Sequence, residues 1–139
     1  MKINVNRVSI TLTKEQLKEI DNQVNNKYTL DDLTSYLKAC EILGEEIVEK
    51  TTKEVKILTI VRAANFLDND NQPWKADFAE KNTSKYLPYF EKTSAGWRVC
   101  YAFGWGFDSF CPVGFYFKKS RTCDLIAKRF IDLYSQWLG

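Results

Sequence analysis

The amino-acid sequence predicts an α+β fold in which N-terminal helices are followed by a three-stranded antiparallel meander and a C-terminal packing helix. Two observations lead to this fold class. Apolar residues recur with helical spacing up to residue 67, whereas residues 86–119 show strand-like alternation interrupted by glycine and proline. A chain of 139 residues fits a single domain. We expect residues 1–50 to be mostly helical and residues 51–139 to supply a core helix, the aromatic meander and the last helix.

The first elements are predicted from alternation and capping signals. Residues 8–12 alternate apolar and polar side chains and predict a short strand. Thr13 and Gln16 then form a T-x-x-Q capping box, which begins a helix that ends at residues 25–26. Thr29 caps a second helix, and Gly44 stands where a left-handed C-terminal cap belongs. Its expected inner stripe is Leu33, Tyr36, Leu37 and Cys40.

The third helix is predicted to lie at the centre of the molecule. A capping box of Thr51 and Glu54 begins it, after the polar link EEIVEKTT. Its apolar residues, from Val55 to Leu67, cover more than half of its circumference, which is typical of a helix contacted from several sides. Pro73 prevents it from continuing.

Three strands and a helix are predicted for the C-terminal half. The strands span residues 86–91, 97–107 and 114–119, with the turn KTSAG between the first two and residues 108–113 between the last two. Ser120 then caps a final helix with an apolar stripe that extends to Leu138.

Aromatic residues are concentrated around the second and third strands. Residues 96–117 contain nine of the twenty aromatic residues and four of the six glycines. Because strand residues alternate between faces, the odd positions of 97–107 predict one almost wholly aromatic face, opposite a small face that includes Gly104 and Gly106. We expect most of these rings to be core. The number of rings exceeds what one helix layer can cover, and an exposed remainder would mark an interaction site.

A group of cations stands at the start of the last helix. Lys118, Lys119 and Arg121 flank a helix N-terminus, an arrangement that can bind a phosphate or a carboxylate. The alternative is a strand end with solubilising lysines and an ordinary serine cap. Arg98 either joins this group or pairs with Glu91.

Composition and motifs exclude several classes of function. The net charge of +2 disfavours nucleic acid as a partner, and no apolar run approaches the roughly 18 residues of a membrane helix, so we expect a cytoplasmic protein without a membrane partner. The sequence shows neither common nucleotide-binding fingerprint, so we expect no cofactor. The chain has no histidine and no C-x-x-C pair, which disfavours a metal site and excludes a Ser–His or Cys–His nucleophile. Residues 68–79 lack the glycine and glutamate of a calcium loop. An enzyme is therefore disfavoured, although carboxylate pairs remain.

The chain contains W-x-x-D-F at 74–78 followed by K-Y-x-P-Y-F at 85–90, with FKKSRTCDL and F-x-D-L-Y towards its end. With these motifs as their most specific part, residues 34–138 resemble a family of small proteins encoded by phages and prophages of gut bacteria. This chain has Phe115 and Tyr116 where similar proteins often show Ser-Arg, which weakens the anion site. The resemblance carries no activity to transfer. It implies a phage accessory protein, in the host cytoplasm, that binds a host protein, a nucleic acid or a small signalling molecule of host defence.

Three functions follow from these observations. The first is a non-catalytic protein that sequesters an anionic, nucleotide-like small ligand by aromatic stacking and cationic contacts. The second is an interaction module that blocks a host protein or joins a phage assembly, with or without self-association. The third is single-stranded nucleic-acid binding. The residues predicted to bind the small ligand are Tyr89, Arg98, Tyr101, Trp105, Tyr116, Lys118, Lys119 and Arg121.

Overall fold

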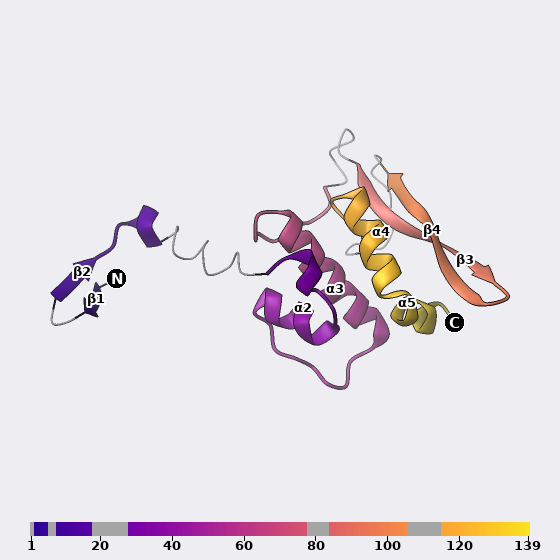
Figure 1. Ribbon diagram of the computed structural model, residues 1–139, viewed down its shortest axis with the longest axis horizontal. Coiled ribbons are helices and arrows are strands. Elements are labelled where there is room, and N and C mark those ends of the chain that lie inside the picture. The colour runs from indigo at the N-terminus through magenta and orange to yellow at the C-terminus, as the bar shows by residue number, and fades with distance from the viewer. Residues whose placement is uncertain (1, 6–7, 18–27, 78–83, 106–114) are drawn as a thin grey trace.

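The computed structural model has the predicted α+β class (Figure 1). It describes residues 2–5, 8–17, 28–77, 84–105 and 115–139, with the backbone alone at 2–5, 8–10 and 101–105. None of the described helices is long and apolar enough to cross a membrane. The elements in chain order are β1 (Lys2–Val5), β2 (Val8–Thr11), the 3-10 helix η1 (Leu30–Asp32), α2 (Tyr36–Leu43), α3 (Lys53–Asp68), β3 (Lys85–Thr93), β4 (Gly96–Trp105), α4 (Ser120–Arg129) and α5 (Ile131–Leu138).

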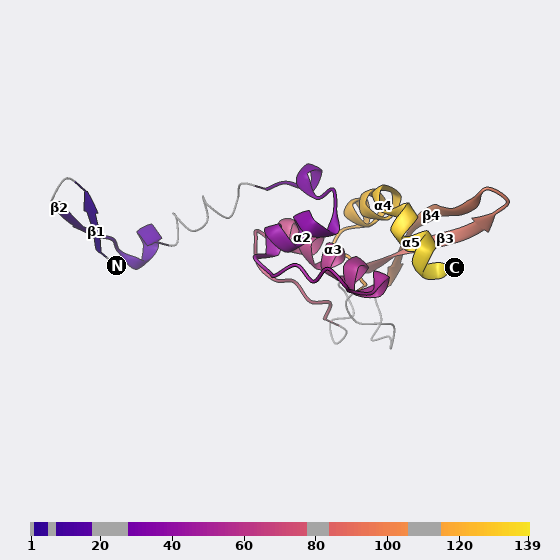
Figure 2. The same ribbon diagram turned by 90° about the horizontal axis from the view of Figure 1, so that it is seen from below.

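The N-terminal strand belongs to a hairpin. β2 confirms the strand predicted at 8–12, but it pairs antiparallel with β1, which the sequence analysis did not predict. The capping box is confirmed, since the Gln16 N–H donates to Thr13 Oγ1 and the Thr13 N–H donates to Gln16 Oε1. Residues 14–17 are helical, and the rest of the predicted first helix lies outside the described residues. The hairpin lies apart from the other elements in both ribbon views (Figures 1 and 2).

The predicted second helix is divided in two. η1 ends at Asp32, and α2 begins after Ser35, whose Oγ accepts a hydrogen bond from the Lys38 N–H at 3.0 Å. Gly44 is the predicted left-handed cap, with φ of 69°. Leu37 was expected in the inner stripe but is exposed. The buried positions of α2 are Ala39, Cys40 and Ile42.

The third helix is central, as predicted. α3 contacts α2, α4 and α5, and seven of its residues are buried. Its cap is Thr52, one residue later than expected, because Thr52 Oγ1 accepts the Val55 N–H at 3.2 Å. Figure 1 shows α3 crossing the middle of the molecule, between α2 and the layer formed by α4 and α5.

The predicted three-stranded meander is wrong, because β3 and β4 form a two-stranded sheet. The segment after residue 114 makes one isolated bridge to β3, in which Tyr86 and Phe117 exchange hydrogen bonds of 3.0 and 2.8 Å. Its other edge faces α3. The buried Asn65 side chain donates to the Tyr116 carbonyl at 2.8 Å and accepts the Lys118 N–H at 2.9 Å. A helix side chain thus satisfies backbone groups on the edge of this segment that points away from β3.

A β-bulge in β4 changes which residues share a face of the β3–β4 hairpin. Tyr89 pairs with Tyr101, but the next residue, Phe90, pairs with Val99, so Cys100 is an extra residue in β4. The bulge shifts the alternation of faces along β4 by one position. Tyr101 is in register with Tyr89, whereas Val99 is in register with Phe90, so positions 99 and 101 belong to opposite faces of the sheet. The predicted single aromatic face over 97–107 is wrong for this reason. Residues 106–114, including Gly106 and the predicted connection, lie outside the described residues.

The last helix is also divided. Lys119 is the N-cap in place of Ser120, and Phe130, with φ of −106° and ψ of 25°, separates α4 from α5. Ile126 and Ala127 of α4 and Tyr134 of α5 are buried, whereas Trp137 and Leu138 at the end are exposed. The bend lets both short helices follow the β3–β4 hairpin, which each of them contacts.

Candidate functional site

Two of the three predicted cations at the start of α4 contact side chains at the end of α3. Lys118 Nζ donates to Asn69 Oδ1 at 2.7 Å. Lys119 Nζ lies 3.7 Å from the carboxylate of Asp68, whose side chain is only 7% exposed. Arg121 is exposed and forms no ion pair among the described residues. The carboxylate of Asp68 counts against an anion site here, because it already neutralises one of the three cations.

Arg98 pairs with Glu91, which was one of the two partners that the sequence allowed. Its Nε donates to Glu91 Oε2 at 2.7 Å across the β3–β4 ladder, and the two residues are in register. The guanidinium holds the pKa of Glu91 below its usual range, and the Cys100 thiol adds a further hydrogen bond to this carboxylate. Arg98 therefore stabilises the exposed face of the hairpin and does not join the lysines of α4.

Two of the four predicted stacking residues, Tyr89 and Tyr116, have described side chains. Tyr116 is 1% exposed, so its ring belongs to the core and is not accessible to a ligand. Tyr89 is 54% exposed and lies on β3. Tyr101 and Trp105 belong to β4, in register with Tyr89 and Lys85, and their side chains lie outside the described part of the structure.

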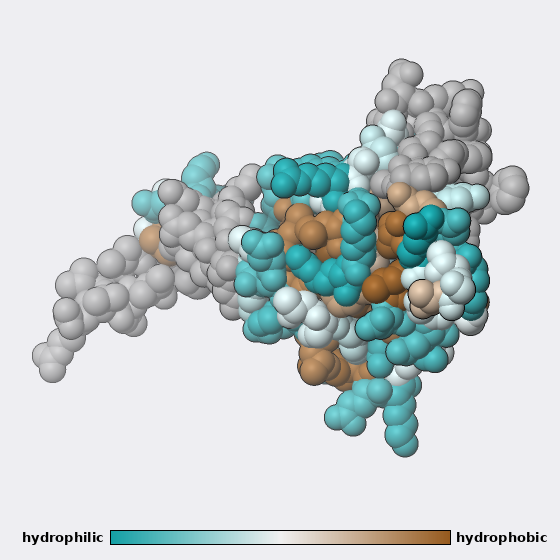
Figure 3. Space-filling model, turned by 45° about the vertical axis from the view of Figure 1, so that its right-hand side comes forward, coloured by the Kyte–Doolittle hydropathy of each residue, from teal (hydrophilic) through white to brown (hydrophobic). Residues whose placement is uncertain are grey.

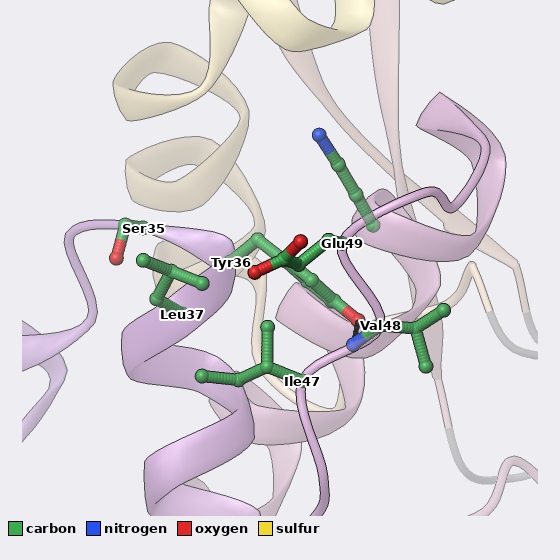
Figure 4. A pocket seen from close by; sticks show the side chains of 7 residues that line it. Ser35, Tyr36, Leu37, Ile47, Val48 and Glu49 are labelled. Carbon is green, nitrogen blue, oxygen red and sulfur yellow. Dashed lines mark hydrogen bonds between the residues drawn. The ribbon is translucent and has the colours of Figure 1, made fainter.

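A hollow lies elsewhere, between α2 and the loop that leads into α3. This groove has a volume of about 650 Å³ and is lined by Ser35, Tyr36, Leu37, Ile47, Val48, Glu49 and Lys56. Leu37 and Ile47 lie on one side of the opening, and the ring of Tyr36 runs behind Glu49 to the backbone of Val48 (Figure 4). The sequence analysis read this loop as a polar link and missed the groove.

The apolar side chains of the groove are well exposed. Leu37 is 55% exposed, Ile47 49% and Val48 55%. Val55, in the first turn of α3, is another exposed aliphatic residue. It precedes Lys56, which lines the groove. Brown hydrophobic surface interrupts the hydrophilic surface in the space-filling view (Figure 3). Single exposed apolar residues are common, but a contiguous group marks an interaction site.

Two tethers hold the loop of the groove in place. The Val48 N–H donates to Tyr36 Oη at 3.3 Å. Arg62 of α3 binds Glu45 through both of its terminal nitrogens, at 2.5 and 2.8 Å. This bidentate contact lowers the pKa of Glu45. The Tyr36 pKa is raised, chiefly by its hydrogen bond with Cys40. Ile47 and Val48 are therefore presented on a fixed backbone and not on a free loop.

A second, smaller niche lies between β3 and α5. It measures about 220 Å³ and is almost wholly apolar. Trp137 stacks on Phe115 beside it, with ring centroids 4.9 Å apart and planes 10° from parallel. The Tyr134 hydroxyl is buried and has no hydrogen-bond partner among the described residues, and burial raises its pKa.

Neither hollow contains an arrangement that favours catalysis. The groove has one carboxylate, Glu49, and one ammonium group, Lys56, which extends towards the Tyr36 ring at 5.9 Å from its centroid. The buried thiol of Cys123 has a pKa raised to about 12 by burial, so it is not an activated nucleophile. No group of three or more metal-binding side chains is found in the described part of the chain.

The comparisons with known proteins give no further information about the site. Among models of protein families, curated proteins and solved structures, none matches this chain.

Proposed function

We propose that this protein is a non-catalytic binding protein that docks a polypeptide in the groove between α2 and residues 45–49. The observation that carries the proposal is the set of half-exposed side chains Leu37, Ile47 and Val48 around one hollow of about 650 Å³. An apolar segment of a partner would remove these side chains from water. Full burial of an aliphatic side chain of this size contributes about 1.5 to 3 kcal/mol.

The rigidity of the groove supports binding. Ordering a flexible loop at an interface costs free energy, which is deducted from the affinity. Here the Tyr36 hydroxyl holds the backbone of Val48, and the Arg62 guanidinium holds Glu45 on the same loop. The apolar side chains are thus largely positioned before a partner arrives.

A nucleotide-like ligand has less support than a polypeptide. Such a ligand needs cations that are not already neutralised, and Arg98 and Lys119 contact Glu91 and Asp68. It also needs exposed rings, and Tyr116 is buried. For a phage accessory protein, which the sequence resemblance implies, a polypeptide partner would come from the host or from the phage.

Site-specific photo-crosslinking tests the proposal. A photoreactive amino acid replaces Leu37 in the full chain, expressed in its host cells, and a matched chain carries it at Leu125, an exposed leucine on α4 outside the groove. We expect polypeptide adducts from position 37 and none from position 125. Equal yields from the two positions, or none from position 37, would contradict the proposal.

A thermal-shift measurement separates the small-ligand alternative. Cyclic nucleotides and cyclic ADP-ribose isomers are added to the wild-type chain and to Leu37→Asp. We expect no shift of the melting temperature in either chain. Among the described residues, Lys56 is the only basic one that lines the groove, and one ammonium group is too little to hold the phosphates of such a ligand. A shift that persists in Leu37→Asp would show a small-ligand site elsewhere and overturn the proposed function.

A further inference from the structure

The N-terminal hairpin has one aliphatic face. Its register pairs Ile3 with Ile10 and Val5 with Val8, and these two pairs alternate with Lys2–Thr11 and Asn4–Ser9. Because successive strand residues alternate between faces, four β-branched aliphatic residues share one side of the hairpin and four polar residues share the other.

Among the described residues, no other helix or strand covers this hairpin. β1 and β2 contact each other, and none of the other described helices and strands makes comparable contact with them. Both ribbon views show the hairpin apart from α2 and α3 (Figures 1 and 2). An isolated two-stranded hairpin is at best marginally stable in water, so its aliphatic face needs another surface.

The charges of the hairpin and of the groove are complementary. Residues 1–14 contain three basic residues and no acidic one, whereas residues 41–49 contain four glutamates and no basic residue. Two of these glutamates, Glu46 and Glu49, are exposed and form no ion pair among the described residues. The hairpin segment is therefore basic in sequence and the loop of the groove is acidic, with Lys56 as the one basic lining residue among those described, so the two segments attract each other.

We propose that the hairpin of one copy of this chain seats its aliphatic face in the groove of a second copy, so that two chains exchange their N-terminal arms. The proposal rests on the proposed function, because it names the polypeptide that the groove binds. Exchange is symmetric: each copy supplies one hairpin and one groove, which closes a two-fold dimer. The sixteen residues between Thr11 and Tyr28 extend to at most about 55 Å, which is enough to reach a neighbouring molecule.

Native mass spectrometry of three full-length variants tests the exchange. We expect the wild-type chain to be a dimer. Ile10→Asp places a charge on the aliphatic face and Leu37→Asp places one in the groove, so both variants should be monomers. Ser9→Asp places the same charge on the polar face of the same strand and should remain a dimer. Thermal unfolding of each variant shows whether its folded body is intact.

Mixing the two monomeric variants gives the sharpest result. Ile10→Asp retains an intact groove and Leu37→Asp retains an intact hairpin, so a one-to-one mixture can form one complete contact. We expect a heterodimer in the mixture although neither variant dimerises alone. A dimer of Ile10→Asp, or a mixture that stays monomeric, overturns the exchange.

A wild-type monomer at all concentrations also overturns the exchange. That outcome leaves the proposed function standing if crosslinks from position 37 still reach another polypeptide. If the crosslinks from position 37 fall within the same chain, on residues 2–11, the hairpin covers its own groove and both proposals fail. The oligomeric state of the wild-type chain thus tests the exchange, and the crosslinks from position 37 test the proposed function.

Discussion

At the scale of single residues, Asn65 has the largest consequence for the fold. Its buried amide bridges the Tyr116 carbonyl and the Lys118 N–H, 51 and 53 residues away in sequence. This contact holds the segment after residue 114 between β3 and α3. An asparagine within an apolar helical stripe gave the sequence analysis no indication of the groups it would bind.

We expect Asn65→Ala to lower the free energy of unfolding by about 2 to 4 kcal/mol, because it leaves a buried N–H and a buried carbonyl without partners. Urea denaturation followed by fluorescence measures the change. Gln72→Ala, at an exposed position shortly after α3, is the control and should change stability little. A loss below 1 kcal/mol for Asn65→Ala would mean that water replaces the amide.

The Glu45–Arg62 contact gives stability a dependence on pH. The pKa of Glu45 is lowered from its ordinary value of 4.5 by the hydrogen bonds from Arg62. The contribution of the pair is therefore complete above about pH 4.5 and is lost as the pH falls through the lower, folded-state pKa. Both side chains are partly exposed, so we expect a small effect.

The test compares urea midpoints of wild-type protein, Glu45→Gln and Glu46→Gln from neutral pH down to acid. We expect Glu45→Gln to be less stable than wild type at neutral pH and to converge with it in acid. Glu46, which has no ion pair among the described residues, is the matched control and should follow wild type throughout. A constant difference between Glu45→Gln and wild type would contradict the assignment.

At the scale of elements, the end of α4 holds the turn that precedes α2. Arg129 Nη1 donates to the carbonyls of Leu30 and Leu33 at 2.6 and 2.8 Å, about a hundred residues away in sequence. These carbonyls lie at the beginning and just after the end of η1. The break between η1 and α2 is thus stabilised by the C-terminal half of the chain.

We expect Arg129→Ala to destabilise the protein by about 1 to 3 kcal/mol, since two carbonyls lose a charged donor. Arg129→Lys should recover part of this loss, because one ammonium group can reach a carbonyl but lacks the planar guanidinium. Chemical denaturation of both variants, with the exposed Arg121→Ala as control, measures the order. Equal stability of Arg129→Ala and Arg121→Ala would contradict the structural role of Arg129.

At the scale of the whole molecule, the N-terminal hairpin and the remaining elements behave as separate parts within one copy. Deletion of residues 1–12 should therefore leave the melting temperature unchanged at low protein concentration. If the arms exchange, the full-length chain becomes more stable as its concentration rises, by mass action, and the deleted chain does not. Differential scanning calorimetry over a concentration series shows whether the two curves diverge. Parallel curves would contradict the exchange.

The sequence by itself determined the local features of this protein. The capping box at Thr13, the left-handed cap at Gly44, the central α3 and the β3–β4 hairpin with its tight turn all follow from short-range patterns. Such features depend on the hydrogen bonds and the apolar period of neighbouring residues, which a sequence displays directly.

Only the tertiary structure decided which surfaces are available for binding. Asn65 binds the backbone of the segment after residue 114, the bulge at Cys100 divides the aromatic face, and Asp68 and Glu91 neutralise predicted cations. The same long-range contacts leave Leu37, Ile47 and Val48 around an exposed groove. The physical reason is that burial and hydrogen-bond partnership are set by residues far apart in the chain, whereas period and capping are set within a few residues.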